Sequence, residues 1–214
     1  MTQPPTTFTT ERSVLASLRT LIPQRTVTSQ AEALRIAEHQ ATKLIDAFGI
    51  TDGPVPVELI GELPKIRIEY VTAPVSGASF WNGDEWIIQL NKYENWTRQR
   101  FTLAHEYKHI IDHNHADHLY TGTRRATPQE QAEHAADYFA GCLLIPKPML
   151  KRVFCSGIQD PADLADHFNV SEAAIRTRLQ QTSLIDQPPR CATTSTPFSR
   201  GWQYRANRTR YQGA

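Results

Sequence analysis

The chain of 214 residues has few cysteines, few methionines and no long apolar run. Its three cysteines, Cys142, Cys155 and Cys191, are scattered and odd in number, which excludes a zinc-finger spacing and a disulfide framework. We therefore expect a reducing, cytoplasmic compartment. No apolar run approaches the ~18 residues that span a membrane. The first residues lack the basic and apolar blocks of a secretory signal, so we expect no membrane segment and no secretion.

Charge of neither sign dominates the chain, which has 23 basic and 22 acidic residues. Five of the basic residues, all Arg, lie after Asp186, and no acid does, so the first 186 residues carry 18 basic and 22 acidic side chains. A basic tail with aromatic residues can bind nucleic acid or an acidic partner. We favour the simpler prediction that residues 187–214 are a disordered, solvated end.

The segment His105-Glu106-Tyr107-Lys108-His109 has the pattern H-E-x-x-H inside a stretch with helical periodicity. Histidines four apart project from one face of a helix, so His105 and His109 can hold one metal ion. Glu106 lies beside the first ligand, where a carboxylate can take a proton from water at the metal. The pattern alone also occurs on solvated helix faces. Six of the eight histidines fall between positions 105 and 134, which favours a metal site.

A catalytic zinc site needs a third protein ligand and an open fourth position, and three residues are candidates. His113 is one turn beyond His109, but a straight helix would carry it past the metal. His115 completes a pattern close to that of the metzincins, but Asp112 stands where that pattern needs Gly for a sharp turn. The Met-turn of those enzymes is also missing, since Met149 is the only methionine after the initiator.

Glu133 is the third candidate and the one that we favour. Thr127, Pro128 and Glu130 form a capping box with Pro at the first helical position, so a helix begins here. Glu133 lies on the edge of its buried face, and Asp137 is one turn further on. Glu-x-x-x-Asp after H-E-x-x-H is what the gluzincin arrangement requires: the Glu binds metal and the Asp accepts the outer N–H of a ligating His. Without the upstream motif, both would be ordinary carboxylates on a helix rim.

Three short strands are predicted upstream of the motif. They are Ile66–Val71, Ala78–Trp81 and Trp86–Leu90, and Asn82-Gly83 predicts a hairpin between the last two. Strands followed by an H-E-x-x-H helix match the zincin layout, in which an edge strand runs over the cleft. Its free backbone groups can pair with an extended substrate. We therefore expect an α+β fold, with a small antiparallel or mixed three-stranded sheet packed on the helices that carry the metal site.

Residues 160–181 have helix-turn-helix spacing. Asp160-Pro161 begins one helix and Ser171 begins the next. Arg176 and Arg178 in the second helix can reach phosphates or base edges, which would make the pair a DNA reader. We favour a helical pair that completes the core or helps to recognise a substrate, because one pair of short helices offers little surface for contacts with DNA.

Two motif blocks together resemble the ImmA/IrrE family of metallo-endopeptidases, over roughly residues 30 to 185. Glu133–Pro146 has the form E-x-x-A-x-x-F-A-x-x-L-L-x-P, and Arg98–His109 has the form R-x-R-F-T-L-A-H-E-x-x-H. The resemblance implies a zincin-like peptidase core, with ligands at His105, His109 and Glu133 and a general base at Glu106. Family members cleave helix-turn-helix repressors. The chain departs from the family in Tyr107-Lys108, where small or aliphatic residues and Gly are frequent.

The sequence therefore predicts a Zn²⁺-dependent endopeptidase, with Mn²⁺ as another possible metal, whose protein substrate is a helix-turn-helix repressor. An assisting electrophile is expected, and the candidates are Tyr93, His113, His118 and Tyr120. The alternative is a DNA-binding or repressor-sequestering regulator whose metal site is structural or vestigial. Sequence-specific duplex binding through residues 160–181, weakened by salt, would distinguish that regulator.

We expect four segments along the chain. Residues 1–28 form a flexible segment with a short helix near Val14–Leu21, and residues 29–156 form the zincin-like metallopeptidase domain. Residues 157–186 form the helix-turn-helix-like appendage, and residues 187–214 form the basic tail.

Overall fold

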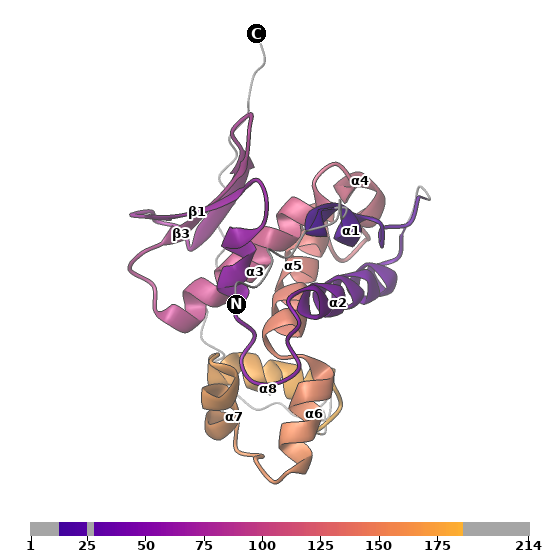
Figure 1. The fold of residues 1–214 in the computed structure, drawn as a ribbon. Helices are drawn as coiled ribbons and strands as arrows, with labels where there is room; N and C mark the ends of the chain where they lie inside the picture. The colour runs from indigo at the N-terminus through magenta and orange to yellow at the C-terminus, as the bar shows by residue number, and fades with distance from the viewer. Residues whose placement is uncertain (1–12, 25–27, 186–214) are drawn as a thin grey trace, which may run out of the picture.

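A three-stranded sheet lies against one helix of a largely helical fold in the computed structural model, which describes residues 13–24 and 28–185 (Figure 1). The elements, in chain order, are α1 (Val14–Arg19), α2 (Gln30–Ala47), the 3-10 helix η1 (Val57–Glu62), β1 (Ile66–Val71), β2 (Gly77–Trp81), β3 (Trp86–Asn91), α3 (Trp96–Asp112), α4 (Ala116–Leu119), α5 (Pro128–Leu144), α6 (Lys147–Cys155), α7 (Pro161–Phe168) and α8 (Glu172–Gln181). The predicted α+β class is confirmed. The predicted tail at 187–214 lies outside the described residues.

The sheet is mixed, with the strand order β1-β3-β2. β1 runs parallel to β3, and β2 runs antiparallel to β3, so the predicted hairpin is present. Asn82 holds its turn, because its side-chain oxygen accepts hydrogen bonds from the backbone N–H of Asp84 and Glu85, both at 2.9 Å. Within the described ranges, no strand pairs with the outer side of β2. β2 is therefore an edge strand with backbone groups available for another chain.

Helices α3 and α5 carry the centre of the hydrophobic core, between the sheet and α2 (Figure 1). Each begins at a polar cap: the Asn95 side chain accepts from the backbone N–H of Arg98, and Thr127 and Glu130 form the predicted capping box. The buried side chains of β3 pack toward α3, whose Leu103 and Tyr107 are almost fully buried. Burial of these apolar faces fixes α3 and α5 side by side.

The predicted helical pair at 160–181 is present as α7 and α8. Asn169 joins them in the left-handed conformation with φ of 55°, and Ser171 caps α8. Its apolar side chains, among them Phe168 and Ile175, belong to the same hydrophobic cluster as α3 and α5. The pair therefore completes the core of the fold.

The short helix predicted near Val14–Leu21 is present as α1. Leu18 is fully buried in the main cluster, and the Arg19 side chain donates hydrogen bonds to the carbonyls of Ile110 (2.7 Å) and Ile111 (3.1 Å) at the end of α3. This part of the segment predicted to be flexible is tied to α3. The domain boundaries at residues 28, 156 and 186 stay predictions. None of the described helices combines the length and the apolarity that crossing a membrane requires.

Candidate functional site

The H-E-x-x-H pattern lies in the second half of α3, as predicted, and its two histidines face each other one turn apart. The Nε2 atoms of His105 and His109 are 3.1 Å apart. His105 is 7% exposed, whereas His109 is only partly buried. One face of α3 therefore places two imidazole nitrogens close together, one buried and one partly exposed.

Helix α5 brings Glu133 to these two histidines. A Glu133 carboxylate oxygen lies 3.2 Å from His105 Nε2, and the other lies 3.7 Å from His109 Nε2. The ligand atoms of these three residues all lie within 4.8 Å of one another, which is close enough to hold one metal ion. Across residues 13–24 and 28–185, no other group of three or more His, Cys, Asp or Glu side chains meets this condition.

The close approach and the donor types of these three side chains suit a divalent metal ion. Bonds of ~2.0–2.1 Å to a central ion place two tetrahedral ligands about 3.3 Å apart. The two Nε2 atoms, 3.1 Å apart, lie close to that value, and each of them has a different Glu133 oxygen nearby, at 3.2 and 3.7 Å. Two imidazoles and one carboxylate are also the donor set of several catalytic zinc sites. The residues present therefore fit a divalent ion with one position left for a substrate or water.

Asp137 lies behind the first histidine, one turn after Glu133 on α5. Its carboxylate is 2.9 Å from His105 Nδ1, on the opposite side of the ring from Glu133. A carboxylate in this position holds the Nδ1 proton and leaves Nε2 directed at the ligand group. The contact expected for Asp137 is therefore present, and its role toward a metal stays a proposal.

Charge within the group shifts the pKa of two of its members. Burial acts to lower the pKa of His105, but hydrogen bonds with Asp137 and Glu133 and the nearby negative charges outweigh burial and raise it to about 9. Burial acts to raise the pKa of Glu133, but its contacts with His105 and His109 outweigh burial and hold it well below its usual range. Without a metal, these shifts therefore favour a positively charged His105 beside a negatively charged Glu133.

Glu106 opens onto the same cleft as the ligand group. The cleft has a volume of about 190 Å³ and is lined by Ser76, Gly77, Arg98, Phe101, Thr102, His105, Glu106, Glu133 and Asp137. Glu106 is 4% exposed, and its Oε2 accepts a hydrogen bond of 2.8 Å from the Ser79 hydroxyl. The Glu106 carboxylate, the ligand-group residues His105 and Glu133, and the edge strand β2 therefore meet in one cleft.

Sequence reasoning missed Ser79 and Arg98. Arg98 is two helical turns before His105 on α3, so helical spacing could have placed it on the cleft face. It donates a hydrogen bond of 3.0 Å to Ser76 and pairs with Glu94 at 3.7 Å. No local signal could have found Ser79, because its contact with Glu106 joins a strand to a helix.

None of the four residues expected as assisting electrophiles lines the cleft. The Tyr120 hydroxyl is buried and donates to Asp112, whereas Tyr93 is 74% exposed. His113 ends α3 and lies edge-on to the ring of Trp86. It is absent from the ligand group, as is His115, which precedes α4.

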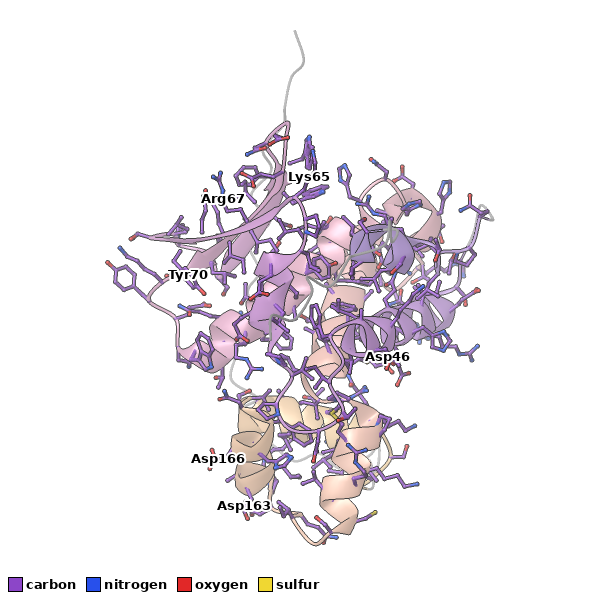
Figure 2. The ribbon with its side chains drawn as sticks, viewed as in Figure 1. Asp46, Lys65, Arg67, Tyr70, Asp163 and Asp166 are labelled. Atoms are coloured by element: carbon purple, nitrogen blue, oxygen red, sulfur yellow. The ribbon has the colours of Figure 1, made fainter. Side chains whose placement is uncertain are left out.

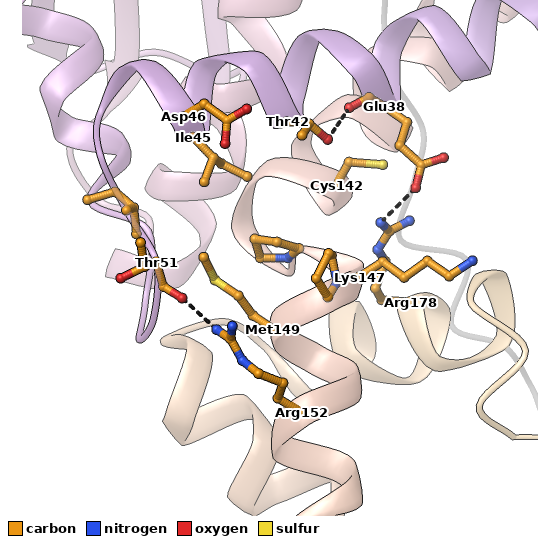
Figure 3. Close-up of a pocket in the computed structure, with 13 residues that line it drawn as sticks. Glu38, Thr42, Ile45, Asp46, Thr51, Cys142, Lys147, Met149, Arg152 and Arg178 are labelled. Carbon is orange, nitrogen blue, oxygen red and sulfur yellow. Dashed lines mark hydrogen bonds and ion pairs between the residues drawn. The ribbon is translucent and has the colours of Figure 1, made fainter.

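A second pocket, of about 230 Å³, lies between α2, the α5–α6 connection and α8 (Figure 3). Arg178 lines it and is 2% exposed, with Glu38 at 3.6 Å and the Ile145 carbonyl at 3.0 Å. None of the predicted site residues lines this pocket. The candidate site is therefore the smaller cleft on α3 and α5.

An α+β domain whose H-E-x-x-H helix faces a glutamate on a second helix is a metallopeptidase-like domain. The family model Peptidase_M78, described as the IrrE N-terminal-like domain, matches residues 65–180, which is more than half of the chain. The chain therefore belongs to this family, and the resemblance predicted from the two motif blocks is confirmed.

One solved structure with a similar fold is a Mycobacterium tuberculosis transcriptional regulator. The two share 16% sequence identity and a TM-score of 0.56, over 81% of this chain and 53% of the regulator. Likeness at this identity shows the fold alone, and this chain corresponds to about half of the regulator's length. No curated protein sequence matches the chain.

Proposed function

We propose that this protein is a zinc-dependent endopeptidase that hydrolyses a peptide bond in a protein substrate. One observation carries the proposal: the Glu106 carboxylate opens onto the same cleft as His105 and Glu133, and Gly77 of the edge strand β2 lines that cleft. A purely structural metal site would need neither an acid beside the ligands nor an open cleft.

His105, His109 and Glu133 are the proposed metal ligands. Zn²⁺ suits two imidazoles and one carboxylate, and Mn²⁺ is also accepted by such a site, so availability decides between them. When bound, the ion would supply a Lewis acid for the peptide carbonyl and would lower the pKa of water to about 7. Asp137 contributes by holding the His105 ring through Nδ1.

Glu106 acts as the general base. It takes the proton of the attacking water and passes it to the leaving amine as the peptide bond breaks. The outer backbone groups of β2 pair with the substrate in an extended conformation beside α3. Such pairing binds a peptide with little dependence on its sequence.

A helix-turn-helix repressor is the proposed substrate, and the cytoplasm is the proposed location. The support is the family membership, since the ImmA/IrrE resemblance implies such substrates. The substrate is inferred from the family alone.

The alternative, a DNA-binding regulator, receives little support from α7 and α8. Arg178 is buried against Glu38 instead of facing solvent, and Arg176 pairs with Glu172 at 3.2 Å. The exposed side of α7 carries Asp163 and Asp166, which point away from the fold in Figure 2. Acids at this surface repel the phosphate backbone of DNA, so we favour the peptidase.

Glu106→Gln tests the proposed function. Zinc-loaded wild type is expected to cleave peptides in a proteome-derived mixture, read as new N-termini by mass spectrometry. Removal of the general base should lower the cleavage rate by at least ~10²-fold, since general-base catalysis contributes about 10²–10⁴-fold. The zinc content should not change. Glu172→Gln, the same chemical change on α8, should cleave as wild type does.

Two results would contradict the proposal. Cleavage by Glu106→Gln at the wild-type rate would remove Glu106 from the mechanism. No cleavage by the zinc-loaded wild type would refute the peptidase and leave the repressor-sequestering reading, for which capture of a repressor without cleavage is the expected behaviour.

A further inference from the structure

We propose that Ser79 is a positioning residue that fixes the carboxylate of Glu106 for proton transfer. The inference rests on the proposed peptidase function and adds to it a residue outside both motif blocks. Ser79 lies on the edge strand β2, whereas Glu106 lies on α3. The substrate-docking strand and the general base are therefore joined by one side-chain contact.

The contact is a direct hydrogen bond. The Ser79 hydroxyl lies 2.8 Å from Glu106 Oε2 and 3.4 Å from the Glu106 backbone carbonyl. A hydroxyl has one proton to donate, and the shorter distance makes the carboxylate its acceptor. Ser79 is paired in register with Ile88, whose buried side chain belongs to the core, so both side chains are on the sheet face that packs against α3.

Gly77 explains why the strand comes so close to the helix. A Cβ added at Gly77 would overlap Cγ2 of Thr102 and would lie 3.3 Å from Cγ of Glu106. Only a residue without a side chain lets β2 approach α3 at this point. Two residues further along the strand, Ser79 is then within hydrogen-bonding distance of Glu106. The backbone of β2 and the general base are thus fixed relative to each other.

Fixing the carboxylate matters because a glutamate side chain rotates about three bonds. The bond to Ser79 occupies Oε2 and leaves Oε1 as the oxygen that accepts the proton from water. A base held in the productive orientation needs no reorganisation when the substrate binds. A residue that orients a functional side chain through a hydrogen bond typically contributes about 10–100-fold to activity.

A merely structural role makes different predictions. If the bond only satisfied a buried carboxylate, Ser79→Ala would lower the melting temperature and leave the turnover of the folded, zinc-loaded enzyme unchanged. If Ser79 shaped the peptide-binding edge, KM would rise instead of kcat falling. The separation of kcat from KM therefore distinguishes positioning from both other roles.

The experiment compares Ser79→Ala and Ser79→Thr with the wild type, using full-length zinc-loaded protein. The reporter is the peptide that the wild type cleaves fastest in a proteome-derived mixture. For Ser79→Ala we expect kcat to fall about 10–100-fold, with KM and zinc per chain unchanged. Ser79→Thr keeps the hydroxyl and should recover most of kcat. Ser17→Ala, in α1 and remote from the cleft, is the matched control and should match the wild type.

Each remaining outcome decides the proposal. A Ser79→Ala kcat within about threefold of wild type, or a loss that Ser79→Thr does not recover, overturns the role of Ser79 and leaves the peptidase function standing. If Ser79→Ala does not fold, Ser79→Cys replaces it, and equal kcat for Cys and Thr overturns the role because a thiol is a weaker donor. No cleavage by zinc-loaded wild type overturns the peptidase function and this inference together.

Discussion

His105 is the side chain on which the candidate site converges, because three carboxylates surround it. Asp137 contacts Nδ1, Glu133 contacts Nε2, and Glu106 is the next residue on α3. These contacts explain why the pKa of His105 is raised to about 9 although burial alone would lower it. At this scale Asp137 has a specific task, which is to hold the ring while Nε2 faces the ligand group.

Asp137→Asn should therefore weaken metal binding without removing it. An amide in place of the carboxylate orients the ring less well and gives a less basic imidazole, so zinc affinity should fall about 10–100-fold. Competition with a chromophoric chelator measures that affinity. Asp163→Asn, on the exposed side of α7, is the control and should bind as the wild type does. An unchanged affinity in Asp137→Asn would show that the hydrogen bond is incidental.

Spacing along single helices predicted much of the site at this scale. Histidines four residues apart indicated the pair on α3, and the capping box at Thr127 indicated where α5 begins and which face Glu133 occupies. The distances that bring the two helices together confirm that the predicted residues meet. Their role as metal ligands stays a prediction. Ser79 escaped prediction because its partner depends on how β2 packs against α3.

At the scale of the elements, helical periodicity predicts which apolar residues of α3 are buried but not which charged residues are. On α3, Leu103, Tyr107 and Ile110 follow a helical spacing and are almost fully buried. Lys108 is buried as well, at 1% exposure, which its residue type does not indicate. Its ammonium group contacts both Asp112 oxygens, at 2.5 and 2.6 Å.

This buried ion pair lies within the last turns of α3, and Asp112 also links α3 to the segment that follows it. Asp112 also accepts a hydrogen bond from the Tyr120 hydroxyl, after α4. Burial acts to lower the pKa of Lys108, and the charge of Asp112 opposes that effect without cancelling it. The chain therefore has a buried salt bridge on the helix that carries His105 and His109.

Lys108→Met should destabilise the fold strongly, because it leaves the Asp112 carboxylate buried without its cation. The expected loss is about 3–5 kcal/mol in the free energy of unfolding, measured by urea denaturation of the metal-free protein. The double variant Lys108→Met/Asp112→Leu should recover part of this loss, since it removes both charges but leaves the Tyr120 hydroxyl without its acceptor. Lys151→Met, at an exposed site on α6, should change stability by less than about 0.5 kcal/mol. A Lys108→Met loss as small as that of the control would contradict a role for the pair.

At the scale of the whole molecule, elements from both ends of the described chain support the helices that carry the candidate site. α1 is bonded to the end of α3, and α7 and α8 add their apolar side chains to the same core. The sequence predicted the helical pair and favoured a role in the core or in substrate recognition, with a DNA reader as the alternative. Arg178 is buried against Glu38 of α2, a partner distant in the sequence, which agrees with the favoured role.

The central claim is a metal centre formed by His105, His109 and Glu133, and metal content tests it most directly. Mass spectrometry of protein purified without added metal is expected to find about one zinc or manganese ion per wild-type chain and almost none in Glu133→Ala, because two histidines alone hold the ion weakly. Metal retained in Glu133→Ala would show that Glu133 is not the third ligand. No metal in the wild type, even after supplementation, would contradict the metal centre and the peptidase built on it.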